Sequence, residues 1–418
     1  MIKTNSNKII NQLIFFVFIA GVCSSCYKVE EEYITNNGFT EVQPMTGIVL
    51  WEESGHNNTN AISLEFSYML YSDIVSEEGI YDWSAVEQKL DAIAERKHQA
   101  IFRFRYVYPG FETAVPQYIK NLSSYDETEG ISEKQTTWFP DWTNQELKDF
   151  TLEFYAHFSE KYDEDPRLAF LQVGFGLWGE YHIYDGPEII GETFPSVSFQ
   201  ETFFNHMDSV FQTTHWSISI DAAKPTVGPF DDFPYLLDTK FGVFDDSFMN
   251  EDHGNSNELM WNYFANDRYT HSPCGGEFSY YSSNDQKNAL SPDGANGEPY
   301  ESFAERFHIT YIIGNDQPSY HTMDRIKVAS INSGYKFEVI LVETIGGQTK
   351  ITANNIGVAP IYYDAYFSLN NILSNESLKS LMPGEQAIFT IDYIGDESIE
   401  IQCDRLVEGQ SIQFKQSF

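Results

Sequence analysis

Strand and helix patterns alternate between residues 46 and 316, and this alternation constrains the fold more than any other feature of the sequence. The run "ISLEFSYMLY" (62–71) has the composition of a strand, "DWSAVEQKLDAIAERKH" (82–98) has apolar residues at helical spacing, and "AIFRFRYVYPG" (100–110) is again strand-like. A strand, a helix and a strand in this order form a right-handed βαβ unit, which implies a parallel sheet. About eight such strands fit this stretch, so we predict a (β/α)8 TIM barrel over residues 46–320.

The pattern changes to short alternating runs after residue 320. Examples are "YKFEVILVETI" (335–345) and "GEQAIFTIDYI" (384–394), which are separated by Gly, Asn and Pro residues. Strands of this kind without long helices are typical of a two-sheet β domain. We therefore predict an antiparallel β-sandwich over residues 321–418.

Residues 1–26 have the organisation of an export signal. Lysines precede the apolar stretch "IINQLIFFVFIAGV" (9–22), and small residues follow it. The segment "CSSC", which ends at Cys26, resembles a bacterial lipobox, and this implies a lipid on Cys26 or, alternatively, on Cys23. The acidic residues that come next are similar to those of Bacteroidota surface lipoproteins, and residues 27–45 are expected to be a tether. We therefore predict an outer-membrane lipoprotein of the cell envelope, surface-exposed or periplasmic.

The composition limits the partners of the chain. It carries 62 acidic and 25 basic residues, a formal net charge of -37. Such a charge repels phosphates, which argues against nucleic acid and against an anionic membrane surface as partners. Aromatic residues make up 16% of the sequence, and aromatic rings can stack on sugars. These properties favour a neutral glycan as the partner.

Two glutamates follow predicted barrel strands. Glu180 ends the apolar run "LQVGFGLWGE" after the fourth strand, and Glu277 lies in "SPCGGEFSYY", the seventh. Their separation of 97 residues agrees with three βα units of about 31 residues each, and catalytic groups of TIM barrels lie at the C-terminal ends of the strands. Retaining glycosidases need two carboxyl groups about 5–5.5 Å apart. Glu180 and Glu277 are therefore the candidate catalytic residues.

Arginines lie in the third predicted strand. Arg103 and Arg105 alternate with phenylalanines, so both project from one face. If this face is the barrel interior, one arginine must meet a carboxylate, because a buried unpaired charge is prohibitive. A role in steadying the nucleophile and a purely structural ion pair both remain open.

Aromatic, histidine and acidic residues near the predicted strand ends complete the candidate site. With the arginines, the predicted substrate-binding residues are Trp51, Arg103, Arg105, Tyr106, Trp178, Tyr181, His182, Asp246 and Tyr280. The acidic loops match no EF-hand spacing, and the sequence contains no Walker A loop, dinucleotide fingerprint, HExxH or GxSxG motif. We therefore predict neither a metal nor a cofactor.

A resemblance to known families covers most of the mature chain. The segment "EEGIYDWSAVEQKLDAIAERKHQAIFRFR" (77–105) resembles the opening of retaining β-glycosidase barrels of the β-galactosidase type, in the 4/7 superfamily. The segments "GLWGEYH" (176–182) and "GGEFSYY" (275–281) are similar to Bacteroidota barrel lipoproteins of largely unknown function. The first resemblance implies an acid/base glutamate after strand four and a nucleophile after strand seven, which correspond to Glu180 and Glu277.

This chain departs from the β-galactosidase type at one position. That type has Asn directly before the acid/base glutamate, where it binds the sugar 2-hydroxyl, and this chain has Gly179. The leading hypothesis is a retaining glycoside hydrolase that acts on a polysaccharide or oligosaccharide. The alternative is a non-catalytic glycan-binding surface lipoprotein, which Gly179 favours. A structural surface protein without a sugar ligand is a third possibility.

Overall fold

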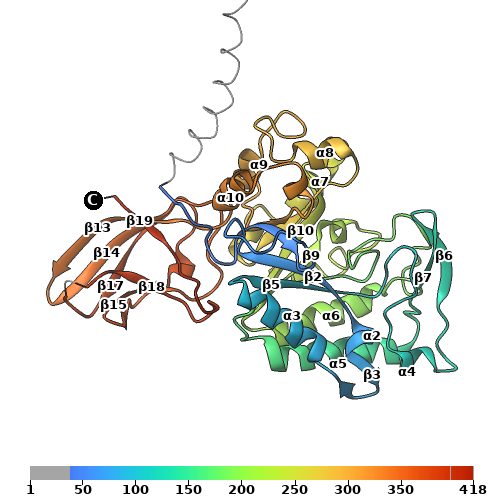
Figure 1. Ribbon diagram of the computed structural model, residues 1–418. Helices are drawn as coiled ribbons and strands as arrows, with labels where there is room; N and C mark the ends of the chain where they lie inside the picture. The colour runs from blue at the N-terminus through green and yellow to red at the C-terminus, as the bar shows by residue number, and fades with distance from the viewer. Residues whose placement is uncertain (1–37, 396, 418) are drawn as a thin grey trace, which may run out of the picture. The chain divides into compact units, whose positions relative to one another are not determined.

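A closed barrel of parallel strands forms the centre of the fold (Figure 1). The structure is a computed structural model that describes residues 38–395 and 397–417. Each barrel strand pairs with the next one along the chain, and the last pairs with the first. The strands within these residues are β1 (Gly47–Trp51), β2 (Leu64–Leu70), β5 (Gln99–Arg105), β8 (Leu168–Val173), β9 (His215–Ser219), β10 (Phe241–Phe248), β11 (Cys274–Phe278) and β12 (Tyr311–Ile313). The predicted closed parallel barrel of eight strands is confirmed for this part of the chain.

Helices follow most of the barrel strands. They are α2 (Tyr71–Ile74), α3 (Ser84–Glu95), α4 (Gln117–Lys120), α5 (Gln145–Tyr162), α6 (Val197–Val210), α7 (Glu251–Tyr263), α8 (Ser283–Asn288), α9 (Tyr300–Arg306) and α10 (Met323–Ile331). Two connections differ from a regular (β/α)8 pattern. The described residues 52–63 contain no helix, and residues 220–240 contain only the 3-10 helices η1 (Ile220–Ala223) and η2 (Pro234–Asp238). Both stretches are rich in Gly, Asn, Ser or Pro, which are poor helix formers.

Helix α10 moves the boundary between the two parts of the chain. The expected boundary at residue 321 assigns Met323–Ile331 to the sheet domain, but this segment is a helix packed on β1. Its Ser330 hydroxyl accepts a hydrogen bond of 3.0 Å from the backbone N–H of Ile48. A Cβ on Gly47 would lie 2.7 Å from the Ser330 Cβ, so only glycine allows this close approach. Helix α10 is therefore the last helix of the barrel.

A hairpin is inserted between β5 and α5. It consists of β6 (Thr128–Ser132) and β7 (Gln135–Phe139). At its tip the backbone N–H of Glu133 donates to Asp185 Oδ2 at 2.7 Å, and the Tyr184 hydroxyl donates to the Glu133 carboxylate. The hairpin thus braces the loop that follows β8. A smaller hairpin joins β3 (Val75–Glu77) and β4 (Ile80–Tyr81).

The C-terminal part consists of two sheets in the described residues. One has the order β17-β14-β13-β19 and the other β16-β15-β18. Phe367 of β15 reaches across to Phe389 and Phe414 in the other sheet, at centroid distances of 5.3 and 5.8 Å. All pairs are antiparallel except β13 with β19, so the larger sheet is mixed, unlike the expected fully antiparallel one. The strands are β13 (Phe337–Ile345), β14 (Gln348–Asn355), β15 (Tyr366–Leu369), β16 (Ile372–Leu373), β17 (Gln386–Ile391), β18 (Glu400–Gln402) and β19 (Phe414–Gln416).

The sheet domain packs against the N-terminal ends of the barrel strands. Tyr363 stacks on Phe170 at 6.2 Å, and its hydroxyl donates to the Ala169 carbonyl oxygen. Buried Arg405 donates from Nη2 to the Leu168 carbonyl oxygen at 2.7 Å and from Nη1 to the Asp163 carbonyl oxygen at 3.2 Å. The sheet domain therefore closes one end of the barrel and leaves the C-terminal ends of the strands to form the site.

Arg405→Ala is expected to destabilise the protein by about 3 kcal/mol, because the carbonyl oxygens that it binds would stay buried without their charged donor. The free energy of unfolding in urea measures this loss. Arg306→Ala is the matched control, since the Arg306 side chain is 43% exposed, and its 3.5 Å ion pair with Glu298 and its stacking over Phe303 and Phe307 leave no buried carbonyl oxygen dependent on it. A change below about 1 kcal/mol for Arg405→Ala would contradict the packing role.

The predicted export signal, the lipid site at Cys26 and the first part of the predicted tether lie outside the described residues. The end of the tether is packed rather than free. The Pro44 carbonyl oxygen accepts a 3.1 Å hydrogen bond from the Tyr335 hydroxyl, and Gln43 Oε1 accepts one of 3.0 Å from the Gln413 backbone. Among the described helices, none has the length and hydropathy needed to cross a membrane.

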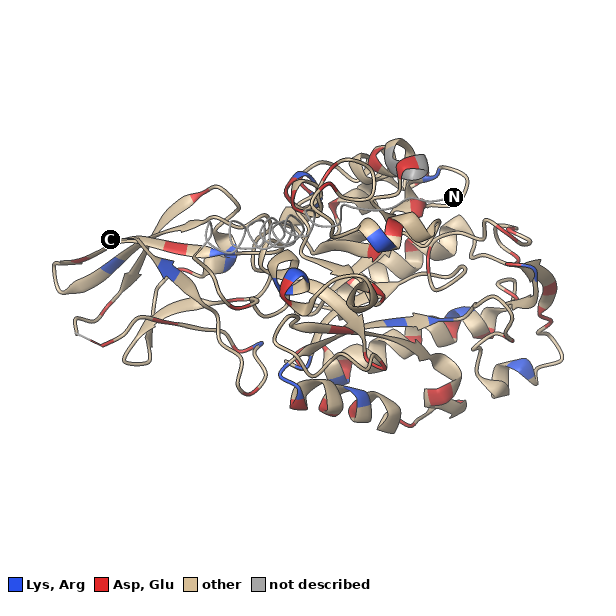
Figure 2. Cartoon of the chain, turned by 45° about the horizontal axis from the view of Figure 1, so that its top comes forward, with Lys and Arg blue, Asp and Glu red and all other residues tan. Residues whose placement is uncertain are grey.

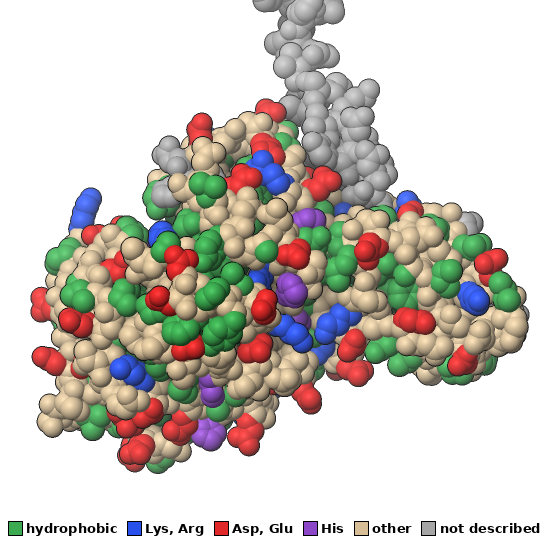
Figure 3. All heavy atoms as spheres, turned by 180° about the vertical axis from the view of Figure 1, so that it is seen from behind, with side chains coloured by type: hydrophobic (Ala, Val, Ile, Leu, Met, Phe, Trp, Pro, Cys, Tyr) green, Lys and Arg blue, Asp and Glu red, His purple; other side chains and the backbone are tan. Residues whose placement is uncertain are grey.

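Charged residues are spread over both parts of the chain. Figure 2 shows acidic residues on helices, strands and loops, with far fewer basic ones among them. The face in Figure 3 has hydrophobic side chains grouped on the barrel, with acidic side chains scattered around them. The acidic residues are therefore dispersed over the surface rather than gathered in one segment.

Candidate active site

Two glycines shape the loop that carries Glu180. After β8 the chain coils back so that the backbone N–H groups of Phe175 and Gly176 both donate to the Glu180 carbonyl oxygen, at 3.1 and 2.8 Å. A Cβ on Gly174 would lie 2.3 Å from the Gly179 carbonyl oxygen, and one on Gly176 would lie 2.0 Å from that of His182. No side chain fits these positions. The glycines therefore allow the tight coil that presents Glu180 at the C-terminal end of the barrel.

A buried ion pair forms the floor of the site. Arg103 on β5 is fully buried, and its Nη1 lies 2.6 Å from Asp246 Oδ2 on β10. Its Nε and Nη2 donate to Gln172 Oε1 at 3.0 and 2.6 Å, and Gln172 Nε2 donates to the Tyr311 hydroxyl at 2.9 Å. The guanidinium also stacks over the ring of Phe244 at 4.3 Å. Arg103 therefore meets the carboxylate that its position in the barrel interior requires.

Glu180 is buried and hydrogen-bonded to a histidine. It is 8% exposed, and its Oε2 lies 3.2 Å from His182 Nε2. Burial raises the pKa of Glu180, and the Asp246 carboxylate raises it further, while His182 and Arg103 oppose the rise. Burial alone would lower the pKa of His182, but the Glu180 carboxylate outweighs it and raises the value to about 8. His182 is therefore protonated at neutral pH.

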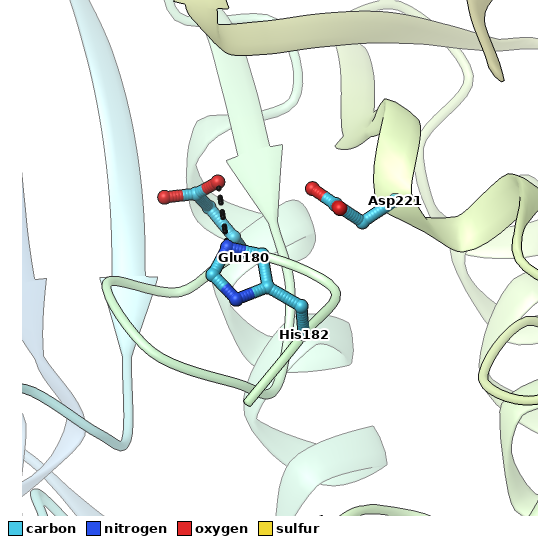
Figure 4. A group of neighbouring side chains, drawn as sticks. All are labelled: Glu180, His182 and Asp221. Atoms are coloured by element: carbon cyan, nitrogen blue, oxygen red, sulfur yellow. Dashed lines mark hydrogen bonds and ion pairs between the residues drawn. The ribbon is translucent and has the colours of Figure 1, made fainter. Parts of the chain in front are cut away.

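Asp221 completes this cluster from the end of β9 (Figure 4). The Glu180, His182 and Asp221 side chains offer atoms that all lie within 4.8 Å of one another, and they are of types that can hold a metal ion. Asp221 already binds Lys224 Nζ at 2.6 Å through Oδ1 and the Ser219 hydroxyl at 2.7 Å through Oδ2. Since Lys224 and protonated His182 already balance the carboxylates, the arrangement fits an ion-pair network better than a metal site.

His182 should make stability depend on pH. Its folded pKa of about 8 lies above the ordinary 6.5, so the stabilisation is fully present below pH 6.5 and is lost as pH rises through 8. This pKa shift corresponds to a contribution of about 2 kcal/mol to the free energy of unfolding. Thermal unfolding of the wild type should therefore show a falling Tm between pH 6.5 and 8.5, and His182→Gln should lose this step. An equal fall in both proteins would contradict the assignment.

Glu277 has a different environment. Burial raises its pKa well above the usual range, the Asp246 carboxylate adds to this, and Arg103 opposes it. Its Oε1 is buried and has no hydrogen-bond partner in the described part of the chain. Other buried polar atoms at this end of the barrel also lack a partner there: Trp51 Nε1, Arg105 Nε, His182 Nδ1 and Asp246 Oδ1. Buried groups of this kind can be satisfied by water or by the hydroxyl groups of a polar ligand.

The structure brings most of the predicted site residues to this end of the barrel. Glu277 influences the pKa of Tyr280, and Arg105 stacks over Tyr108 at 4.4 Å. The Trp178 ring stacks on Tyr184 at 5.8 Å, and Tyr184 is 55% exposed. The predicted residues found here are Trp51, Arg103, Arg105, Trp178, Glu180, His182, Asp246, Glu277 and Tyr280.

Two predicted binding residues lie elsewhere. Tyr106 is fully buried against Trp142 and Tyr71, and its hydroxyl pairs with Thr151 of α5 at 2.8 Å. Tyr181 is fully buried among Phe175, Phe194 and Phe204. Both rings belong to the apolar core between the barrel and its helices, so they cannot contact a ligand at the site.

Sequence reasoning missed several neighbours of the catalytic candidates. Tyr68 pairs in register with Arg103, and burial raises its pKa, with Arg103, Glu277, Asp246 and Glu180 all close enough to influence it. Gln172 and Asp221 were also missed. Tyr68 shares the strand face of Phe66, and Asp221 lies two residues after the end of the fifth strand, so strand parity and strand ends were the available signals.

No protein-family model and no curated protein sequence matches this chain. Among solved structures, the catalytic domain of β-amylase from Paenibacillus polymyxa is similar with a TM-score of 0.43 and 12% identity, over 69% of this chain and 99% of that one. An α-galactosidase from Thermus thermophilus, in complex with p-nitrophenyl α-D-galactopyranoside, has a TM-score of 0.42 and 11% identity, over 77% and 68%. A catalytic mutant of a GH42 β-galactosidase from G. stearothermophilus has a TM-score of 0.27 and 14% identity, over 65% and 40%. These neighbours are glycoside hydrolases, and with scores below 0.5 no residue role follows from them.

Proposed function

We propose that the chain is a glycoside hydrolase that cleaves O-glycosidic bonds of a polysaccharide or oligosaccharide with retention, using Glu180 and Glu277. The charge balance of the site carries this proposal. Among the described residues, Arg103 pairs with Asp246 and Lys224 with Asp221, which leaves protonated His182 for the two glutamates.

One cation can balance only one of the glutamates. The other must hold a proton, because a buried charge without a partner is prohibitive. Both carboxyl groups are shifted in that direction, since burial raises the pKa of each. Retaining and inverting glycosidases both use one protonated and one ionised carboxyl group. This charge balance therefore supports hydrolysis by Glu180 and Glu277, while the proposal of retention rests on the resemblance to the β-galactosidase type.

The surroundings of the glutamates suit a sugar. Trp178 and Tyr184 form a stacked aromatic pair beside the loop of Glu180, and Tyr280 is 50% exposed near Glu277. Sugar hydroxyls can both donate and accept, so they can satisfy the unpaired atoms of Trp51 and Asp246. The net charge of -37 favours neutral over sulfated glycans.

The test measures reducing-end release from neutral and sulfated polysaccharides and from aryl glycosides. The wild type is compared with a Glu180→Gln/Glu277→Gln double variant, which keeps the side-chain shapes. NMR of the first-formed product gives its anomeric configuration. Release by the wild type alone, with retention, is expected. Inversion would overturn the retaining mechanism, and equal release by both proteins would overturn the role of the glutamates.

A non-catalytic glycan-binding protein is the second candidate, because the unpaired polar atoms and the aromatic pair at the site would serve binding alone. Its expected signature is no release by the wild type together with retention on one immobilised glycan. Trp178→Ala should then abolish retention. Release of sugar by the wild type would reject this candidate.

We further propose that a lipid on Cys26 holds the protein at the outer membrane, on the support of the lipobox resemblance. Cys26→Ser is expected to move the protein from the membrane fraction to the soluble fraction. Cys23→Ser is the matched control, because only three positions separate the two cysteines. Release by Cys23→Ser alone would place the lipid on Cys23 instead.

A further inference from the structure

The two glutamates of the site differ in their hydrogen-bond donors. Glu180 Oε2 lies 3.2 Å from His182 Nε2. His182 in turn lies beside Asp221 (Figure 4). Asp221 Oδ1 accepts a hydrogen bond of 2.6 Å from Lys224 Nζ. A histidine between two carboxylates is stabilised in its protonated form. A carboxyl group that accepts a hydrogen bond from such a cation is stabilised in its ionised form. Glu180 is therefore expected to be ionised more readily than Glu277.

Glu277 has no charged donor of this kind, and the neutral Trp51 indole is the hydrogen-bond donor that lowers its pKa. Its Oε1 is buried without a hydrogen-bond partner among the described residues. Arg103 is the nearby cation, but its guanidinium nitrogens already bind Asp246, Gln172 and the Trp178 carbonyl oxygen. The carboxylates of Asp246 and Glu180 are also close enough to disfavour a charge on Glu277. Glu277 is therefore expected to stay protonated more readily than Glu180.

The residue before Glu180, Gly179, also argues against an acid/base role for Glu180. Gly179 has a φ of +73°, and a Cβ there would lie 3.1 Å from Arg103 Cδ and 3.2 Å from the Phe104 carbonyl oxygen. Asparagine tolerates a positive φ better than most residues, but its Cβ would require Arg103 or the Phe104 backbone to move by a few tenths of an ångström. The packing of Arg103 therefore disfavours, beside Glu180, the asparagine that precedes the acid/base glutamate in the β-galactosidase type.

We propose that Glu180 is the nucleophile and Glu277 the proton donor, which reverses the roles that the β-galactosidase resemblance implies. This inference rests on the proposed retaining hydrolysis. His182 and Asp221 act as positioning residues, because they keep the Glu180 carboxylate ionised and oriented.

Hydrolysis then proceeds in two displacement steps. A Glu180 carboxylate oxygen bonds to the anomeric carbon while the glycosidic C–O bond breaks, and the leaving oxygen takes the electron pair and the proton of Glu277. Ionised Glu277 then removes a proton from water as the water oxygen bonds to the anomeric carbon. The ester bond to Glu180 breaks, and both carboxyl groups return to their initial states.

The first test traps the covalent intermediate in the wild-type protein. A 2-deoxy-2-fluoro glycosyl fluoride slows the second step, so the labelled enzyme accumulates, and peptide mass spectrometry locates the label. The label is expected on Glu180. A label on Glu277 or Asp246, or its absence from Glu180 in a protein that hydrolyses with retention, would overturn the role assignment. A wild type without any hydrolytic activity would instead overturn the proposed function.

The second test uses the pH profile of kcat/KM for an aryl glycoside in His182→Gln. The acidic limb reports the ionisation of the nucleophile and the alkaline limb that of the acid. Loss of His182 raises the pKa of Glu180, since His182 holds it down. The acidic limb is therefore expected to move to higher pH with the alkaline limb in place. Movement of the alkaline limb alone would make Glu180 the acid and overturn the proposal.

Discussion

Glu277→Gln is expected to lower kcat on a polysaccharide by about 10³-fold, because a general acid contributes about 10²- to 10⁴-fold. Stability should not fall. Burial raises the pKa of Glu277, so its protonated form is favoured in the folded state, and the stability that this gives is lost as pH rises through the folded pKa. Glutamine has no such ionisation, so the variant should be more stable than the wild type at alkaline pH. Product release assays and thermal unfolding at pH 5, 7 and 9 measure both effects.

Glu53→Gln is the matched control for this prediction. Glu53 also follows a barrel strand, β1, but its side chain is 71% exposed and lies 3.5 Å from Lys89. Its replacement should change neither kcat nor the pH dependence of stability. A Glu277→Gln protein with activity within about tenfold of the wild type would contradict a role in proton transfer.

The barrel could be predicted because its strands are short, apolar and separated by helical patterns. The alternation in β5 alone gives the interior face, since Arg103 and Arg105 project inward while Phe104 packs against Phe154 of α5 and Phe102 is buried in the same core cluster. Applied one residue further, the same parity places Tyr106 outside, where the structure has it. That error came from treating a strand-end tyrosine as a ligand contact without following the parity.

Helix α10 could not be separated from the sheet domain by sequence alone. Its nine residues, Met323–Ile331, include buried Ile326, Ala329 and Ser330 on one side, which is too short a pattern to distinguish from the alternating runs that follow. Its position is fixed by a tertiary contact, the close approach of Ser330 to Gly47. Such a contact joins residues far apart in the chain, and no local propensity encodes it.

The positions of the two glutamates at the strand ends could be predicted, but the network of side chains around them could not. Glu180 and Glu277 follow from strand counting, whereas the pairing of Arg103 with Asp246 depends on which of two adjacent aspartates faces the barrel interior. Asp245 instead accepts from Asn257 of α7, at 3.0 and 2.9 Å. The bulge where β10 pairs with β11 shifts the register just there, so parity counted along β10 could not decide between them.

Arg103→Met is expected to destabilise the protein by about 3–5 kcal/mol, because it leaves the Asp246 carboxylate buried without its cation. Methionine keeps much of the volume and stays apolar, so the loss reports the charge rather than a cavity. The Arg103→Met/Asp246→Asn double variant should recover part of this loss, since neither partner then holds an unpaired charge. Denaturant unfolding of the wild type, both single variants and the double variant measures the coupling.

The same variants separate stability from catalysis. Asp246 raises the pKa of both Glu180 and Glu277, and Arg103 lowers both by a smaller amount. The pH profile of kcat/KM should therefore move to lower pH in Asp246→Asn, and by less in the double variant, where the loss of Arg103 opposes the shift. An Asp246→Asn protein with an unmoved profile would show that Asp246 serves the fold alone. An Arg103→Met protein within about 1 kcal/mol of the wild type would show that water or another group can replace the guanidinium. The floor of the site would then be less isolated from solvent than the full burial of Arg103 indicates.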